Sequence, residues 1–166
     1  MALASGQVGI YTGKENLILG LDPGRDKIGF AFSDFEGRLI LSGIFPSSER
    51  DNFFNDFTHY VIEGKININK DLMSHVKLVS IGNGTHSREF TEYVKNKISC
   101  EILTVDEKNT TLEARGLYWE INRPSFFMRL LPEGLRVPSR VLDDLAAWSI
   151  ALRGLKKYRD ISGNKL

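Results

Sequence analysis

The chain has 166 residues, of which 42% are hydrophobic and 26% charged, and its 22 basic and 21 acidic residues leave a formal net charge of +1. This composition predicts one globular domain with a core of its own, and the near-neutral charge excludes a global field that would attract nucleic acid or an anionic membrane. A lone cysteine, Cys100, excludes an internal disulfide, and the absence of a membrane-length apolar stretch or a signal-peptide pattern predicts a cytoplasmic protein without a membrane partner.

The apolar pattern predicts five strands, which we place at 17–22, 28–32, 38–45, 76–81 and 101–105. A turn at 34–37 joins the second strand to the third, so the first three strands form an antiparallel meander. Residues 1–15 are small, glycine-containing and weakly patterned, and we expect a flexible lead-in there. A single domain then spans 16–160, and 161–166 form a tail.

Helical spacing of apolar residues predicts four helices: one over roughly 49–63, a short one carrying Phe90, Tyr93 and Val94, one over 110–121, and a last one capped by Ser139. Ser48 with Asp51, and Thr110 with Glu113, have the spacing of capping pairs. Residues 122–138 hold three of the five prolines and predict a loop. A helix after each of the last two strands indicates parallel pairing.

Acidic residues stand at three element ends: Asp22 after the first strand, Asp106 and Glu107 after the fifth, and Asp143 and Asp144 in the first turn of the last helix. Each has an ordinary alternative explanation, a turn for the first and the helix dipole for the others. A sheet of this order brings all three together, and clustered carboxylates repel one another without a cation. We therefore predict a two-metal site for Mg²⁺ or Mn²⁺ that serves phosphodiester hydrolysis.

The third ligand comes from one of two adjacent aspartates, Asp143 and Asp144. On a helical wheel Asp144 lies at the margin of the apolar stripe, while Asp143 points away from it. We take Asp143 as the ligand because first-turn side chains reach past the helix end, with Asp144 as its helper or substitute. No Cys or His pair offers the ligands that zinc prefers.

Three motifs together resemble the YqgF/RuvX family, the RuvC-like branch of the ribonuclease H-like superfamily: LGLDPGRDKIGFAFS at 19–33, VDEKNTTLEAR at 105–115 and DDLAAWSI at 143–150. The resemblance implies an α/β fold with a five-stranded mixed sheet of order 3-2-1-4-5 flanked by helices. It also implies a divalent-metal endonuclease that resolves Holliday junctions or matures the 16S ribosomal RNA precursor. Its catalytic residues fall on Asp22, Glu107 and Asp143.

A second function stays open. The loop IGNGTHSRE at 81–89 resembles the YqgF-like domain of the transcription accessory protein Tex, which implies a non-catalytic nucleic-acid-binding module. Residues 123–159 hold eight basic and three acidic residues, a local basic surplus, and Phe126 and Phe127 within it are candidates for base stacking, for packing or for a partner contact.

The expected partner in either case is structured DNA or RNA, and a resolvase that cuts two opposed strands also implies a homodimer. Eight residues are candidates for contacts with nucleic acid: Arg25, Lys27, Asn83, Thr85, His86, Lys108, Arg136 and Arg140.

Overall fold

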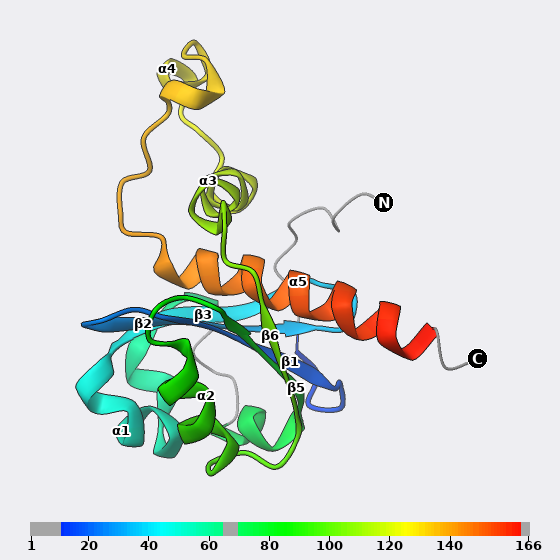
Figure 1. The fold of residues 1–166 in the computed structure, drawn as a ribbon. Helices are drawn as coiled ribbons and strands as arrows, with labels where there is room; N and C mark the ends of the chain where they lie inside the picture. Colours follow the sequence, from blue (N-terminus) through cyan, green and yellow to red (C-terminus); the bar gives the residue numbers. More distant parts are fainter. Residues whose placement is uncertain (1–10, 65–69, 164–166) are drawn as a thin grey trace.

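The computed structural model describes residues 11–64 and 70–163 (Figure 1). Six strands form one sheet: β1 (Leu17–Pro23), β2 (Lys27–Asp34), β3 (Leu39–Pro46), β4 (Val61–Gly64), β5 (Val76–Gly82) and β6 (Glu101–Val105). Their order is β4-β3-β2-β1-β5-β6; β1 pairs antiparallel with β2 and parallel with β5, and β5 pairs parallel with β6. The predicted meander, parallel strands and strand order are confirmed. The prediction of five strands is wrong, because β4 adds a sixth at the edge beside β3.

The segment that contains β4 was predicted as one helix over 49–63, and this prediction is wrong. It holds a 3₁₀ turn (Ser47–Glu49), α1 (Arg50–Asn55), a second 3₁₀ turn (Phe57–Tyr60) and then β4. At Asp56 the backbone is extended, and the carboxylate accepts a hydrogen bond from the Thr58 amide at 3.1 Å, which ends α1 and starts the next turn. Phe53 and Phe57 are both buried. Their spacing therefore reflects packing against the sheet and not one continuous helix.

The remaining helical elements are a 3₁₀ turn at Lys70–His75, α2 (Ser87–Lys95), α3 (Thr110–Ile121), α4 (Phe126–Arg129), a 3₁₀ turn at Glu133–Leu135 and α5 (Asp143–Gly163). The predicted helix at 110–121 is confirmed with the same bounds. The region 122–138, predicted as a loop, contains α4. Ser139 does not cap α5, which begins four residues later; its hydroxyl lies 2.9 Å from that of Tyr118 on α3.

Neither predicted capping pair forms, since α1 and α3 both begin without a side-chain cap. The carboxylate of Asp51 accepts a hydrogen bond from the Tyr93 hydroxyl at 2.6 Å, so it ties α1 to α2. The carboxylate of Glu113 accepts from Ser149 and pairs with Arg153, both on α5. The side chains that local spacing assigned to helix capping therefore bind partners on other elements instead.

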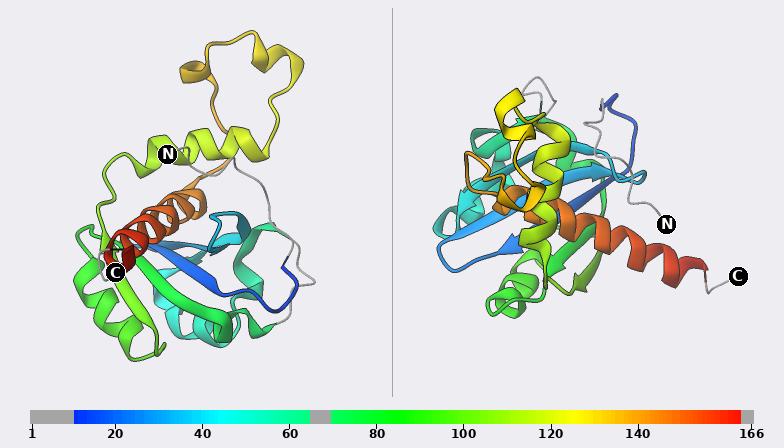
Figure 2. Two further views of the ribbon diagram at one scale, coloured as in Figure 1. Left: turned by 90° about the vertical axis from the view of Figure 1, so that its right-hand side faces the viewer. Right: turned by 90° about the horizontal axis from the view of Figure 1, so that it is seen from above.

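The sheet separates two helical layers (Figures 1 and 2): α1 and α2 cover one face, and α5 covers the other with α3 stacked above it. Side chains of β1 alternate between the layers. Leu19 and Leu21 join the core with Phe53 of α1, whereas Ile18 faces the α5 layer. None of the helices within residues 11–64 and 70–163 has the length and hydropathy to cross a bilayer.

A row of small residues lies side by side in register beneath α5: Ser80 on β5, Gly20 on β1, Ala31 on β2 and Ser42 on β3. They let the helix backbone rest on the sheet. A Cβ at Gly20 would lie 2.1 Å from the carbonyl oxygen of Ala147, and the Ser80 hydroxyl donates to the carbonyl of Ile150 at 2.8 Å. This close seating determines where the first residue of α5 lies.

Gly29 tests this seating directly, because a Cβ there would lie 2.0 Å from the carbonyl oxygen of Asp143. We expect Gly29→Ala to destabilise the protein by about 1–3 kcal/mol in urea unfolding, since α5 must move off the sheet. Gly116→Ala is the matched control: that position lies inside α3 with nothing within 4 Å of a new Cβ, so stability should rise by about 0.5–1 kcal/mol. A Gly29 variant as stable as the wild type would contradict the inference.

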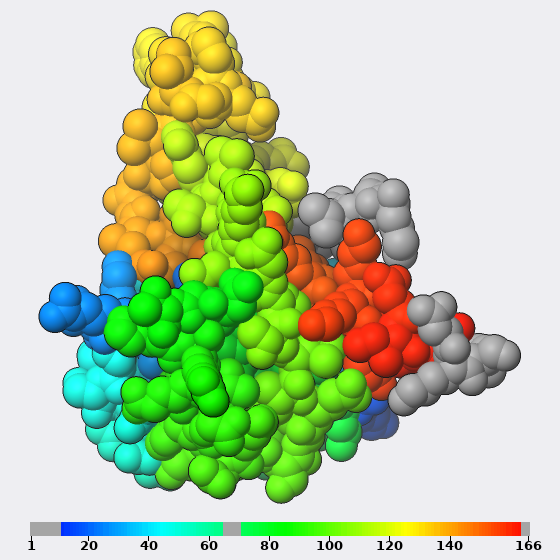
Figure 3. Space-filling model, viewed as in Figure 1, coloured from blue at the N-terminus to red at the C-terminus, as the bar shows by residue number. Residues whose placement is uncertain are grey.

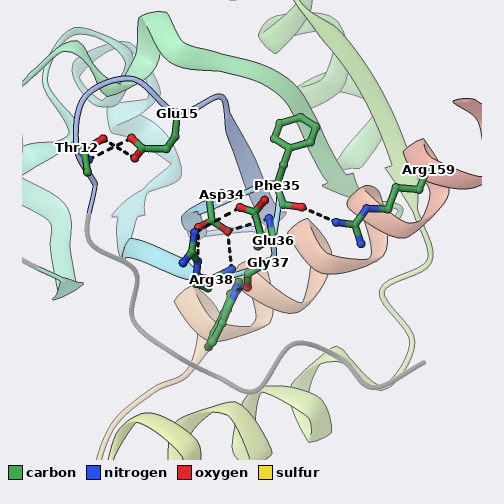
Figure 4. Close-up of polar contacts among 9 residues, drawn as sticks. Thr12, Glu15, Asp34, Phe35, Glu36, Gly37, Arg38 and Arg159 are labelled. Carbon is green, nitrogen blue, oxygen red and sulfur yellow. Dashed lines mark hydrogen bonds and ion pairs between the residues drawn. The ribbon is translucent and has the colours of Figure 1, made fainter.

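The predicted turn at 34–37 is confirmed at the opposite end of β2 (Figure 4). The Asp34 carboxylate accepts hydrogen bonds from the amides of Glu36 at 3.0 Å and Arg38 at 2.8 Å. Gly37 adopts a φ of 86°, which favours glycine, and its carbonyl accepts from the Trp148 indole N–H at 3.1 Å. The turn is thereby tied to the middle of α5.

Part of the predicted lead-in and tail can be placed. Tyr11 packs against the core and contacts the ring of His75, and Glu15 accepts a hydrogen bond from the Thr12 amide at 3.1 Å (Figure 4). At the other end α5 continues to Gly163. The rest of both predicted segments lies outside the described residues.

Candidate functional site

Two of the predicted catalytic carboxylates flank Gly29. Asp22 stands opposite Gly29 in the β1–β2 register, and the backbone of Asp143, the first residue of α5, lies directly over that glycine. Asp22 follows Gly20 by two residues, so both face α5. The absence of a side chain at Gly29 thus lets the start of the helix come close to the end of β1.

The third carboxylate, Glu107, follows β6 and leans over the loop after β5. Its amide donates to the Asn83 side-chain oxygen at 3.2 Å, and the Asn83 amide donates to the Val105 carbonyl at 2.9 Å. A Cβ at Gly82 would lie 2.9 Å from Oε2 of Glu107, and one at Gly84 would lie 2.4 Å from Oε1. The two glycines therefore make room for this carboxylate, a role that their spacing in the sequence did not reveal.

Glu107 and Asp143 are near enough to Asp22 to affect its ionisation. Burial and the negative charges of Glu107 and Asp143 together raise the pKa of Asp22 from 3.8 to about 6, against the opposing effect of Lys27. Because each carboxylate comes from a different element, only the folded chain assembles this cluster.

Lys27 supplies the positive charge nearest to Asp143. Its Nζ lies 2.7 Å from Oδ2 of Asp143, and the lysine side chain is about half exposed at 47%. That Oδ2 is out of contact with solvent and has no hydrogen-bond partner in the part of the chain that the structure describes. The pair is thus a close ion pair without a directed hydrogen bond, made by a lysine side chain that is half exposed.

Asp144 lies on the other side of the helix and is fully buried. Its carboxylate accepts from the Ser42 hydroxyl at 2.7 Å and from Arg140 at 2.7 and 3.1 Å, and Arg140 also pairs with Glu63 of β4 at 2.9 Å. The prediction of Asp144 as an additional metal ligand is therefore not supported, because Arg140 and Ser42 already engage both of its oxygens. The helical wheel placed Asp144 at the margin of the apolar stripe, and Asp144 is indeed the buried residue of the pair. Asp143 is the residue that lies at the carboxylate site.

The candidate nucleic-acid contacts divide into two groups. Six are exposed and lie near the ends of β1, β5 and β6 around the carboxylates: Arg25, Lys27, Asn83, Thr85, His86 and Lys108. Arg25 and His86 also line a cleft of about 480 Å³, together with Ser47 and Arg50. Arg50 was missed by the sequence analysis, because only the fold brings the start of α1 to this edge.

The other two candidates, Arg136 and Arg140, are held by internal partners. The Arg136 Nε donates to the carbonyls of Met128 at 3.0 Å and Leu131 at 3.1 Å, and Arg140 pairs with two carboxylates. These contacts are structural, so the sequence-based assignment of both arginines to nucleic-acid binding is not supported.

The donor set fits a divalent cation in its chemistry. Carboxylate oxygens are the ligands that Mg²⁺ and Mn²⁺ prefer, and a cation would relieve the crowding that raises the pKa of Asp22. In residues 11–64 and 70–163, however, no group of three or more His, Cys, Asp or Glu side chains stands in a metal-binding arrangement. Binding therefore requires side-chain movement, and exposed Lys27 is the first group to displace.

A scan against protein-family models and a search of curated proteins both find no match to this chain.

Proposed function

We propose that the protein is a cytoplasmic, divalent-metal-dependent endonuclease of YqgF/RuvX type with a ribonuclease H-like fold, acting on structured nucleic acid such as a Holliday junction or the 16S ribosomal RNA precursor. The observation that carries this proposal is the gathering of Asp22, Glu107 and Asp143 from three separate segments, with Glu107 and Asp143 near enough to raise the pKa of Asp22. The strand order, which contains the order implied by the family resemblance, supports it. A homodimer would place two such sites on opposed strands.

In this proposal Asp22, Glu107 and Asp143 hold Mg²⁺ or Mn²⁺ in a two-metal site. The bound ions supply an activated water and neutralise charge on the phosphate. Lys27 leaves Asp143 and pairs with a substrate phosphate, while exposed Arg25 and Lys108 fix the position of the nucleic-acid backbone. Asp22 is ionised above its pKa of about 6, so the site is ready for a cation at neutral pH.

The test is cleavage of a four-way junction and of precursor ribosomal RNA with Mg²⁺ or Mn²⁺. We expect Glu107→Gln to reduce the cleavage rate at least about 100-fold, because the charge stabilisation that a bound cation supplies is worth several kcal/mol. Asp106→Asn is the matched control, since it removes the same charge from the exposed neighbouring residue. Equal losses in the two variants, or full activity of Glu107→Gln, would sink the proposal.

A second candidate function is a non-catalytic nucleic-acid-binding module of Tex type. It is favoured by the ion pair between Lys27 and Asp143, which offsets one negative charge of the cluster without a metal, and by the exposed loop residues Thr85 and His86. This function predicts salt-sensitive binding that survives loss of Asp22, with no cleavage by any divalent ion. The same cleavage assay, followed by binding at increasing salt, therefore separates the two functions.

A further inference from the structure

Residues 122–141, which we call the arm, leave the body between α3 and α5 and rise beyond α3 (Figures 1 and 2). Of the ten exposed large hydrophobic residues in the described parts of the chain, seven lie in the arm: Phe126, Phe127, Leu130, Leu131, Leu135, Val137 and Val141. Phe126 and Phe127 are 73% and 79% exposed. Figure 3 shows the arm projecting from the body, and its exposed residues make this projection apolar.

Arginine side chains of the arm donate hydrogen bonds to its own backbone and hold its shape. Arg136 donates to the carbonyls of Met128 and Leu131, and Arg129 donates to the carbonyl of Pro124 at 3.2 Å. With Arg136 and Arg140 engaged by internal partners and the aliphatic side chains turned outward, the surface of the arm suits an apolar protein partner better than a phosphate backbone. This distribution argues against the base-stacking role considered for Phe126 and Phe127.

A groove of about 630 Å³ lies between α3 and the C-terminal half of α5. Leu117, Leu152 and Leu155 give it apolar walls, and Gly116 leaves its α3 side open. Four acidic and three basic side chains surround it; the acidic ones are Glu36, Glu113, Glu120 and Asp160. The groove therefore combines an apolar lining with a slightly acidic rim.

We propose that the occupant of this groove is the arm of a second copy of the chain, with arms exchanged reciprocally in a closed two-fold dimer. Charge complementarity supports the pairing, because Arg123 and Arg129 stay exposed on the arm while the rim of the groove is net acidic. In one copy the arm rises above α3 while the groove lies beneath it against α5, so an arm does not fill its own groove (Figure 1).

The exposed area also matches what a stable dimer needs. Taking roughly 200 Å² for an aromatic side chain, Phe126 and Phe127 together expose about 300 Å², and the aliphatic residues of the arm add to this. A specific interface buries about 800 Å² on each partner. In a reciprocal exchange each chain contributes both its arm and its groove to the buried area. The proposal is read out as the oligomeric state of the chain, so it is tested independently of the nuclease activity.

The first test is sedimentation equilibrium of the full chain. We expect a dimer at micromolar concentration, and Phe126→Ser with Phe127→Ser should weaken the dimer at least about 100-fold, as expected for paired aromatic anchors. Ile62→Ser, which removes an exposed apolar side chain on β4, should leave the dimer unchanged. Unchanged circular dichroism would show that the arm variant is folded. A monomer at 100 micromolar protein, or an open-ended series of oligomers, would overturn the proposal.

The second test locates the contact by cross-linking. In a Cys100→Ser background, chains carrying Phe127→Cys are mixed with chains carrying Gly116→Cys and treated with a short bis-maleimide reagent. We expect a cross-linked heterodimer only when both variants are present, whereas Ile62→Cys in place of Gly116→Cys should give none. A cross-link within one doubly substituted chain at high dilution would show that the arm reaches its own groove and would contradict the exchange.

Discussion

Asp144→Ala is expected to destabilise the protein by about 3–5 kcal/mol, whereas Asp143→Ala is expected to cost less than about 1 kcal/mol. Asp144 is fully buried, and its removal leaves the Arg140 guanidinium with one carboxylate in place of two and the Ser42 hydroxyl without its acceptor. Asp143 loses only an ion pair with the half-exposed Lys27. Two adjacent residues of the same type should therefore differ greatly in their effect on folding.

Urea unfolding at pH 7 measures this difference, and equal m values for the variants would show that the unfolded states are comparable. The cleavage assay should give the opposite order. Asp143→Asn is expected to lose activity while remaining folded, and Ser42→Ala serves as a control that removes one hydrogen bond of Asp144 at a cost of about 1 kcal/mol. If the two aspartates proved equally important for stability, the assignment of Asp143 to the site would be wrong.

Asp22→Asn is expected to make the metal-free protein more stable above pH 6 while abolishing cleavage. The pKa of Asp22 is raised from 3.8 to about 6 in the folded chain, so the folded state holds this proton more tightly than the unfolded state. Its contribution to stability is thus complete below pH 3.8 and is lost as the pH rises to about 6. The loss amounts to about 3 kcal/mol, and the asparagine variant does not suffer it.

Thermal melting of both proteins in a chelator between pH 4 and pH 8 tests this expectation. The difference between the melting temperatures should grow in favour of Asp22→Asn as the pH rises, while Asp106→Asn, a change at an exposed carboxylate, should follow the wild type. Adding Mg²⁺ at pH 8 should raise the melting temperature of the wild type more than that of Asp22→Asn. A variant that is less stable than the wild type at pH 8 would show that Asp22 has a structural role.

Local patterns predicted most of the regular elements. The apolar runs located five of the six strands, and the bounds of α3 were predicted correctly. In these segments the apolar residues recur with the spacing of the strand or helix that the segment forms. The strand β4 was missed, since its four residues acquire strand geometry only by pairing with β3. The spacing of the aromatic residues before β4 fits one continuous helix as well as it fits the short helical segments that form. Only the packing of Phe53 and Phe57 on the sheet distinguishes these two structures.

The candidate site shows the same division. The sequence alone determined that one carboxylate lies at the end of β1, another follows β6 and a third begins α5, because strand ends and helix starts are local features. Only the tertiary structure decided which acid of the Asp143–Asp144 pair faces Asp22, and that Arg140 is a structural partner of Asp144. Those outcomes depend on the close seating of α5 over Gly20 and Gly29 and on Glu63 from the unpredicted strand. Burial and charge pairing arise between distant segments, so they are absent from any local pattern.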